Sequence, residues 1–337
     1  MIEVRPIRSR SKVLMLELQH VDQNQNGYHD LASFQERFER LMSHVSSVVV
    51  ISQDKLKLAL LGLFAQGHLL LDDLPVVGKT LLAKTISFSL DGVFSRIQFT
   101  PDLLPSDITG TSVFNLRDQT FEYVPGPIFA NVVVADELNR AGPRTQSALL
   151  EAMAEGQVSA DGKVRLLPRP FFTIATQNLV ETHGTFPLPN SQLDRFLVSM
   201  ALGLPTPDQE MEILSRWEQG IPQAPPVLTP QDVASMQDSA RTVAVALSVK
   251  QYIVNLTAAS RQQSQFTLGV SPRGSAAMLR ACQAWAAFEG RGFVVPEDVQ
   301  CLAPHVWAHR VVVRGEAEMG SGRQAIAELL RSVPVPL

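Results

Sequence analysis

Residues 69–84 of the chain read LLLDDLPVVGKTLLAK. The apolar run before the loop predicts a buried strand, and the run after the loop predicts a helix. Between them, Gly78, Lys79 and Thr80 match the end of the pattern G-x-x-x-x-G-K-[ST], in which backbone N–H groups surround a phosphate. A strand, a loop and a helix in this order form the context that the pattern requires. The segment therefore predicts a nucleotide-binding site.

A second motif, VVVADE at residues 132–137, ends an apolar strand with two acids. A carboxylate at the end of a strand beside a phosphate loop can hold Mg²⁺, and a neighbouring acid can deprotonate an attacking water. We therefore assign Asp136 to the metal and Glu137 to the role of general base. The alternative is a pair of acids that complements a helix N-terminus. The Gly-Lys-Thr motif upstream favours catalysis, because the two motifs share one mechanism.

Three further polar residues are candidates for phosphoryl-transfer chemistry. Asn178 follows a predicted strand and could orient water, although a turn-forming Asn is the simpler interpretation. Arg195 precedes a strand and could neutralise a transferred phosphoryl group from a neighbouring subunit, or pair with Asp194 on the surface. Arg273 follows a helix start at Ser271-Pro272 and could reach the γ-phosphate, or be an exposed helix arginine.

Short apolar runs alternate with helix patterns up to residue 204, which predicts a parallel sheet covered by helices on both faces. Two hairpins interrupt the alternation at 111–126 and 157–167. A cluster of prolines then marks a linker, and helix patterns follow it. A short strand is expected at 13–18. We divide the chain into an irregular extension (1–35), an αβα nucleotide-binding core (36–204), a linker (205–228) and an all-helical lid (229–337).

Composition excludes several classes of protein. The length of 337 residues favours two domains. The net charge of −4 argues against a general nucleic-acid binder. No apolar run approaches the length of a membrane-spanning helix, and the first residues lack the core of a signal peptide. Cys282 and Cys301 lie in helical patterns and suit reduced, buried thiols of a cytoplasmic protein.

Five segments together resemble the MoxR family of AAA+ ATPases. The resemblance covers roughly residues 40–315, and it is specific because these runs occur together in few other families. The segments, in chain order, are GHLLLDDLPVVGKTLLAK, VVVADELNRAGPRTQSALLEAMAEGQV, ATQN, GTFPLPNSQLDRF and GVSPRGSAAMLRACQAWAAFEGRGFVVPEDV.

The resemblance implies a Rossmann-like αβα domain with a helical lid, assembled into a ring that is commonly a hexamer. It implies ATP and Mg²⁺ as cofactors, with the metal at Thr80 and Asp136. By the same resemblance Asn178 is sensor 1, Arg195 the arginine finger and Arg273 sensor 2. The hairpins at 111–126 and 157–167 match the helix-2 insert and the insert before the sensor strand. The residues implied in nucleotide binding are Asp73, Pro75, Val76, Val77, Gly78, Lys79, Thr80 and Leu81.

The loop departs from the family pattern GxPGxGKT, because Asp73 and Val76 replace glycines. Valine is strained at positive φ, where glycine is not. Asp73 places a negative charge near a triphosphate, and at an effective dielectric of about 20 a unit pair roughly 5 Å apart repels by about 3 kcal/mol. That energy corresponds to on the order of a hundredfold in affinity. The other motif residues remain, which favours residual, slow or ring-dependent ATP hydrolysis.

Three functions stay open at this point. The first is a ring-forming ATPase that remodels or matures a protein partner in a chaperone-like way, often with a partner that carries a von Willebrand factor A domain. The second is an assembly scaffold of the same fold that binds nucleotide without hydrolysing it. The third, a nucleic-acid motor, is the least favoured, because the chain is acidic and no helix-turn-helix reader is recognisable.

Overall fold

The computed structural model describes residues 25–72, 78–177, 184–220, 225–315 and 321–336, with only the backbone at 25–30 and 219. The described residues form two compact units. One comprises residues 37–237, and the other joins the residues before 37 to those after 237. The expected strand at 13–18 and the loop residues Asp73, Pro75, Val76 and Val77 lie outside the described residues, as does Asn178.

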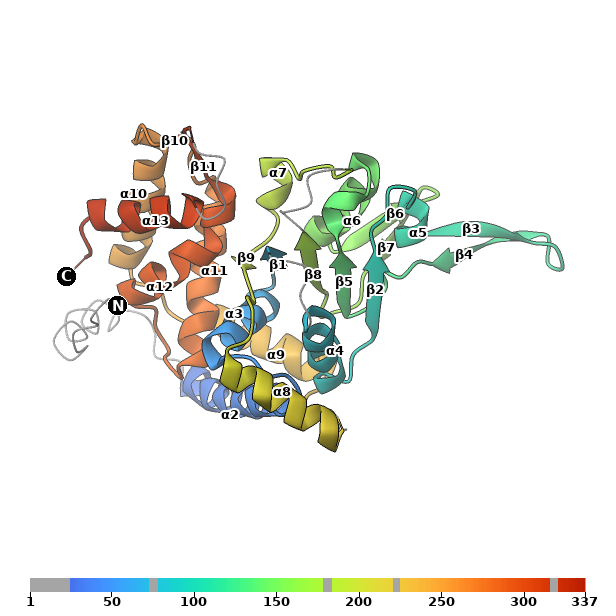
Figure 1. Ribbon diagram of the computed structural model, residues 1–337, viewed down its shortest axis with the longest axis horizontal. Coiled ribbons are helices and arrows are strands. Elements are labelled where there is room, and N and C mark those ends of the chain that lie inside the picture. The colour runs from blue at the N-terminus through green and yellow to red at the C-terminus, as the bar shows by residue number, and fades with distance from the viewer. Residues whose placement is uncertain (1–24, 73–77, 178–183, 221–224, 316–320, 337) are drawn as a thin grey trace. The chain divides into compact units, whose positions relative to one another are not determined.

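A five-stranded parallel sheet forms the centre of unit 37–237 (Figure 1). The strands lie in the order β2-β5-β8-β1-β9, so neighbours in space are not neighbours in sequence and helices make the connections. The apolar runs predict strands at 68–71, 95–99, 132–136, 171–176 and 197–202, and all five are observed with ends within two residues. They are β1 (Leu69–Asp72), β2 (Phe94–Gln98), β5 (Val132–Asp136), β8 (Phe172–Gln177) and β9 (Val198–Met200).

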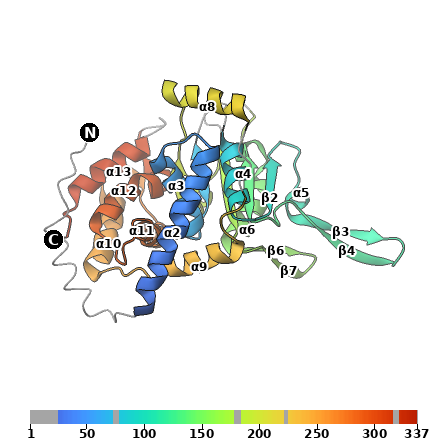
Figure 2. The same cartoon turned by 90° about the horizontal axis from the view of Figure 1, so that it is seen from below.

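Helices supply the outer layers of this unit (Figures 1 and 2). Leu70, Val133 and Ala175 share one face of the sheet and belong to a buried cluster with Leu149 and Leu150 of α6. Helix α4 packs against β5 and β2, and α3 packs against β9. The αβα core that the sequence predicts is therefore confirmed. The helices between residues 53 and 193 are α3 (Gln53–Phe64), α4 (Lys79–Ser89), α5 (Pro105–Thr109), α6 (Pro143–Glu155) and α7 (Asn190–Leu193).

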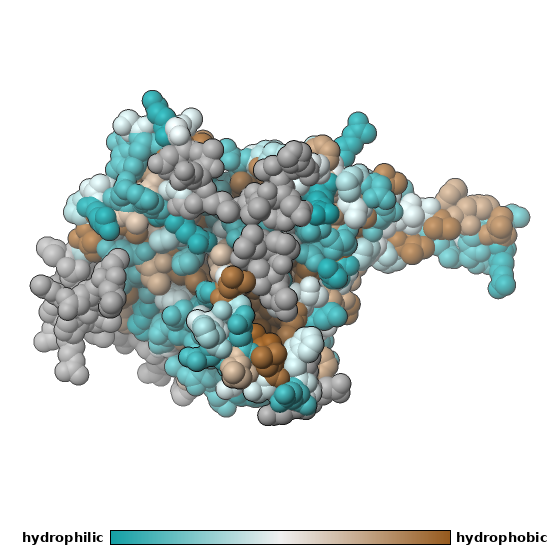
Figure 3. Space-filling model, in the orientation of Figure 1, coloured by the Kyte–Doolittle hydropathy of each residue, from teal (hydrophilic) through white to brown (hydrophobic). Residues whose placement is uncertain are grey.

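Both predicted hairpins are present, and the first extends away from the sheet (Figures 1 and 2). The pairs are β3 (Gly110–Asn115) with β4 (Thr120–Pro125), and β6 (Gln157–Ala160) with β7 (Lys163–Leu166). Apolar side chains are exposed along β3–β4, including Phe121 at 74% and Leu116 at 83% (Figure 3). Tyr123 of this hairpin packs under the guanidinium of Arg165 from the other, 3.6 Å from the ring centre, which joins the two hairpins.

The expectation of an irregular segment up to residue 35 is wrong for residues 25–35, which form the first part of helix α2 (Gln25–Val48). Leu31, Phe34, Phe38 and Leu41 recur at helical spacing and are all buried, so this apolar face fixes the helix. Because the residues before 31 are mostly polar, the hydrophobic pattern does not indicate the start of the helix.

The expected linker at 205–228 contains helix α8 (Pro207–Gln219). Thr206 accepts a hydrogen bond from the N–H of Gln209, and Pro207 occupies the first turn, so the helix start is capped by local sequence. Helix α9 (Pro230–Arg241) follows. The division between the two units falls at residues 237–238, within α9, rather than in the segment 205–228.

The described part of the second unit is helical with one short pair of strands. Burial raises the pKa of the Cys282 thiol, and this cysteine lies in the core as predicted. Cys301 is exposed, so the prediction that it is buried is wrong. None of the described helices has the length and hydropathy to cross a bilayer. Besides the start of α2, the end of α9 and the 3₁₀ helix Ala308–Arg310, this unit contains α10 (Leu247–Gln262), β10 (Phe266–Leu268), α11 (Pro272–Phe288), α12 (Pro296–Val306), β11 (Val312–Val313) and α13 (Ser321–Ser332).

Candidate active site

The first part of the site is the N-terminus of helix α4. Gly78 precedes the helix at φ 112°, a left-handed conformation, and nothing lies within 4 Å of where a Cβ would stand. Glycine is therefore required by the backbone bend and not by lack of space. The first helical hydrogen bond runs from the N–H of Leu82 to the carbonyl of Gly78 at 2.8 Å. Helix geometry leaves the preceding N–H groups, those of Lys79, Thr80 and Leu81, without partners inside the helix.

Lys79 opens this helix and is only 8% exposed. The helix dipole opposes a cation at the N-terminus of a helix. The same place is favourable for an anion, because the N–H groups of the first turn point toward it. The combination of a buried lysine with a helix N-terminus fits a phosphate, as the sequence predicts.

The second part of the site is the acid pair at the end of β5. Asp136 is the last residue of the strand, and Glu137 follows it in a left-handed conformation with φ 55° and ψ 48°. This conformation costs a non-glycine residue about 1–2 kcal/mol and persists only where surrounding bonds enforce it. Glu137 precedes the short 3₁₀ helix Leu138–Arg140, so the pair does not open an α-helix.

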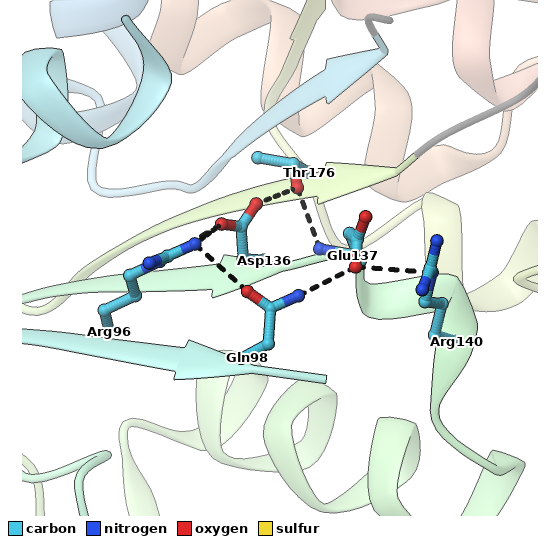
Figure 4. A network of polar contacts seen from close by, with 6 residues as sticks. All are labelled: Arg96, Gln98, Asp136, Glu137, Arg140 and Thr176. Carbon is cyan, nitrogen blue, oxygen red and sulfur yellow. Dashed lines mark hydrogen bonds and ion pairs between the residues drawn. The ribbon is translucent and has the colours of Figure 1, made fainter. Parts of the chain in front are cut away.

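Thr176, on β8, joins the two acids (Figure 4). Its hydroxyl donates to Asp136 Oδ1 at 2.7 Å and accepts the backbone N–H of Glu137 at 2.9 Å. One side chain therefore fixes the carboxylate of Asp136 and also the bend at Glu137. Asn178, the predicted water-orienting residue, lies two positions after Thr176 in the sequence.

Two residues of β2 hold the carboxylates from the other side (Figure 4). Arg96 donates to Asp136 Oδ2 at 2.6 Å and also to Gln98 Oε1 at 3.0 Å. Gln98 in turn donates to Glu137 Oε2 at 2.8 Å. The guanidinium of Arg140 lies 3.3 Å from the same Glu137 oxygen. Both contacts are made to Oε2, so they hold the Glu137 carboxylate through one of its two oxygens.

Sequence reasoning missed Arg96, Gln98, Arg140 and Thr176. A signal for the first two exists, because they alternate with buried Ile97 in strand β2 and therefore share one face. Gln98 lies directly opposite Asp136 in the register. No comparable signal marks Thr176, because threonine is common in buried strands.

The donors present fit a magnesium ion held mainly by phosphate oxygens. Mg²⁺ keeps several waters and usually takes one or two protein oxygens together with phosphates. The Asp136 side chain is 17% exposed. Its Oδ2 accepts both Nε and NH2 of Arg96, whereas the bond from Thr176 takes one of the two lone pairs of Oδ1, so Oδ1 is the oxygen that would face the metal or its waters. Thr80, in the first turn of α4, would supply a hydroxyl.

Arg195 lies between α7 and β9, three residues before the first residue of the strand. Its NH1 donates to the carbonyl of Leu150 at 2.5 Å, and its Nε is buried without a partner. Arg273 belongs to the other unit, in the first turn of α11, so its role at the phosphate stays a prediction.

Comparison of the chain with known proteins identifies related families and proteins. Residues 68–198 match the model described as "ATPase family associated with various cellular activities (AAA)", and residues 258–329 match the AAA lid domain. The chain is 45% identical to the uncharacterized protein YeaC of Bacillus subtilis, over 88% of this chain and 94% of that protein. It is 37% identical to the chaperone MoxR1 of Mycobacterium tuberculosis, over 92% and 85%.

A solved structure agrees with the sequence relatives. The crystal structure of a candidate ATPase from Cytophaga hutchinsonii superposes with a TM-score of 0.85 and is 33% identical. The match covers 93% of this chain and 99% of that one. The parallel sheet, the Gly78–Thr80 turn and the acid pair thus occur on a fold shared along almost the whole chain. The chain belongs to the MoxR family of AAA+ ATPases.

Proposed function

We propose that this protein hydrolyses ATP at the site formed by α4 and the end of β5. The observation that carries the proposal is the bridge made by Thr176, which fixes Asp136 and Glu137 together. When bound, Mg²⁺ would neutralise charge on the phosphates. Lys79 and the first-turn N–H groups of α4 would bind the phosphates, and Thr80 and Asp136 would hold the metal.

Glu137 acts in this proposal as the general base. Gln98 and Arg140 fix one of its oxygens, which orients the carboxylate. The other oxygen then takes a proton from the attacking water. Asn178, which the structure does not describe, and Arg195 from a neighbouring subunit remain the proposed water-orienting and charge-neutralising groups.

We expect Glu137→Gln to keep nucleotide binding and to lower kcat by about 100-fold or more, because the amide cannot accept the proton. Steady-state phosphate release and binding of a fluorescent nucleotide measure the two effects. Glu151→Gln, at an exposed position of α6, is the matched control and should leave both unchanged. Undiminished turnover in Glu137→Gln would remove Glu137 from the role of base.

A nucleotide-binding scaffold without hydrolysis is the second candidate, and it is favoured by Asp73 and Val76 in the loop sequence. The variant Asp73→Gly separates the two functions. If the wild type releases no phosphate and Asp73→Gly does, the scaffold gains support. If the wild type releases phosphate, the scaffold is excluded.

We further propose that the protein assembles into a ring, of six subunits by analogy with the family, and remodels a protein partner in the cytoplasm. The chaperone name of one relative and the exposed apolar residues of β3–β4 support this. A partner carrying a von Willebrand factor A domain is proposed from the family resemblance alone. Sedimentation velocity with and without Mg–ATP tests the ring, and a monomer under both conditions would contradict it.

A further inference from the structure

Asp72, the last residue of β1, joins the ends of three neighbouring strands. Its Oδ1 accepts a hydrogen bond from Gln177 Nε2 of β8 at 2.6 Å, and its Oδ2 accepts one from the hydroxyl of Ser199 of β9. Asp72 is half-buried, whereas Gln177 and Ser199 are 8% and 4% exposed. Strand β1 lies between β8 and β9, so one carboxylate connects all three strands at their carboxyl ends.

The chemistry of the cluster requires an acceptor with two oxygens. Both partners present donors, and only an ionised carboxylate accepts on both sides without offering a donor of its own. Hydrogen bonds to an ionised group are about twice as strong as those between neutral groups. Gln177 lies directly opposite Asp72 in the parallel register, so this bond resists sliding of β8 relative to β1.

The end of β8 is held from both faces of the sheet. Successive residues of a strand point to opposite faces, so Thr176 faces the acids of β5 while Gln177 faces Asp72. Asn178 follows Gln177 directly, and the nucleotide loop follows Asp72 directly. The two residues that precede these segments in the sequence are therefore joined to each other by a hydrogen bond.

We propose that Asp72 is a positioning residue for phosphoryl transfer, acting through Gln177 to set the end of β8 relative to the start of the nucleotide loop. This role rests on the proposed ATPase function. Misplacing a reacting group by about 1 Å can cost on the order of 100-fold in rate. We expect the bond to matter more for kcat than for nucleotide KM, because it leaves Lys79 and the first turn of α4 in place and shifts the groups that must be aligned for reaction.

The test is a double-mutant cycle in the full-length chain, with Asp72→Ala, Gln177→Met and the combined variant. We expect each single variant to lower kcat by roughly 10- to 100-fold while nucleotide KM changes less than about threefold. The combined variant should be no slower than the slower single one, because both remove the same bond. Thr173→Val, also on β8, is the control and should keep wild-type kcat.

Gln177→Met keeps the test usable if Asp72→Ala fails to fold, since methionine preserves the length of the buried side chain. Asp72→Glu, which retains the carboxylate, should keep more activity than Asp72→Ala. Unchanged kcat in folded Asp72→Ala or Gln177→Met, or effects that multiply in the combined variant, would overturn the positioning role alone. Absence of phosphate release by the wild type would overturn the proposed function and this role with it.

Discussion

Among single residues, Thr176 has the clearest consequence for the site. Its hydroxyl holds both the Asp136 carboxylate and the Glu137 N–H. Thr176→Val preserves the shape of the side chain and leaves that N–H without its partner. We expect a loss of about 1–3 kcal/mol in the free energy of unfolding, measured with urea. We also expect kcat for ATP to fall by about tenfold or more, because the acids lose their common support.

Thr173, on the same strand, is a threonine whose hydroxyl supports no other group among the described residues. Thr173 is fully buried, and its hydroxyl has no hydrogen-bond partner. Thr173→Val replaces an unpaired buried hydroxyl by a methyl group, so stability should be unchanged or higher. If Thr176→Val lowers the free energy of unfolding and kcat no more than Thr173→Val does, the bridge between the acids contributes nothing to stability or to turnover.

The residues of the site divide into those that a sequence motif marks and those that only the fold brings together. Gly78, Lys79 and Asp136 were predicted, because their chemistry fixes their spacing along the chain. Arg96 and Thr176 belong to other strands and meet the acids only through the sheet order β2-β5-β8. Because the order of strands in a sheet cannot be read from motifs in the sequence, neighbours of this kind were not predicted.

Among the elements, helix α9 offers a test of local electrostatics. Asp232 accepts the backbone N–H and the hydroxyl of Thr229 at 2.9 and 2.8 Å, and Arg37 lies 3.2 Å away. The backbone hydrogen bond from Thr229 is the largest cause that lowers the pKa of Asp232 below its usual 3.8, followed by the hydroxyl. The acid therefore stabilises the fold while it is ionised.

A lowered pKa in the folded state sets the direction of the pH dependence. The contribution is complete above the unfolded pKa of 3.8 and is lost as the pH falls through the folded value. Asp232→Ala should cost about 1 kcal/mol in the free energy of unfolding at neutral pH. The difference from the wild type should shrink below pH 3.8. Asp238→Ala, at an exposed position of the same helix, is the control; a cost that does not vary with pH would contradict this account.

Elements with strong local signals were predicted, and those with weak signals were missed. The strand at 132–136 was placed at its observed ends because its apolar run is uninterrupted. The start of α2 at Gln25 was missed, because the residues before Leu31 are polar. Helix α8 was missed although Thr206-Pro207 carries the same start signal as Thr229-Pro230, because the surrounding prolines indicated a linker.

On the scale of the whole molecule, the proposed ring makes Arg195 act on a neighbour's nucleotide. Arg195→Ala and Glu137→Gln should each be inactive alone. Mixed in equal amounts, they should recover about a quarter of the wild-type turnover, because one interface in four pairs an intact Glu137 with an intact Arg195. Phosphate release after subunit exchange measures this. No recovery in confirmed mixed rings would place Arg195 in its own subunit's site.

The central claim is that the N-terminus of α4 and the acids of β5 form one site for magnesium-bound ATP. Calorimetric titration of the folded wild type with Mg²⁺ and a non-hydrolysable ATP analogue tests this most directly. We predict one saturable site per chain and at least a tenfold loss of affinity in Lys79→Ala, because the buried ammonium would contact the phosphates. No heat of binding in the wild type, or equal affinity in Lys79→Ala, would contradict the account.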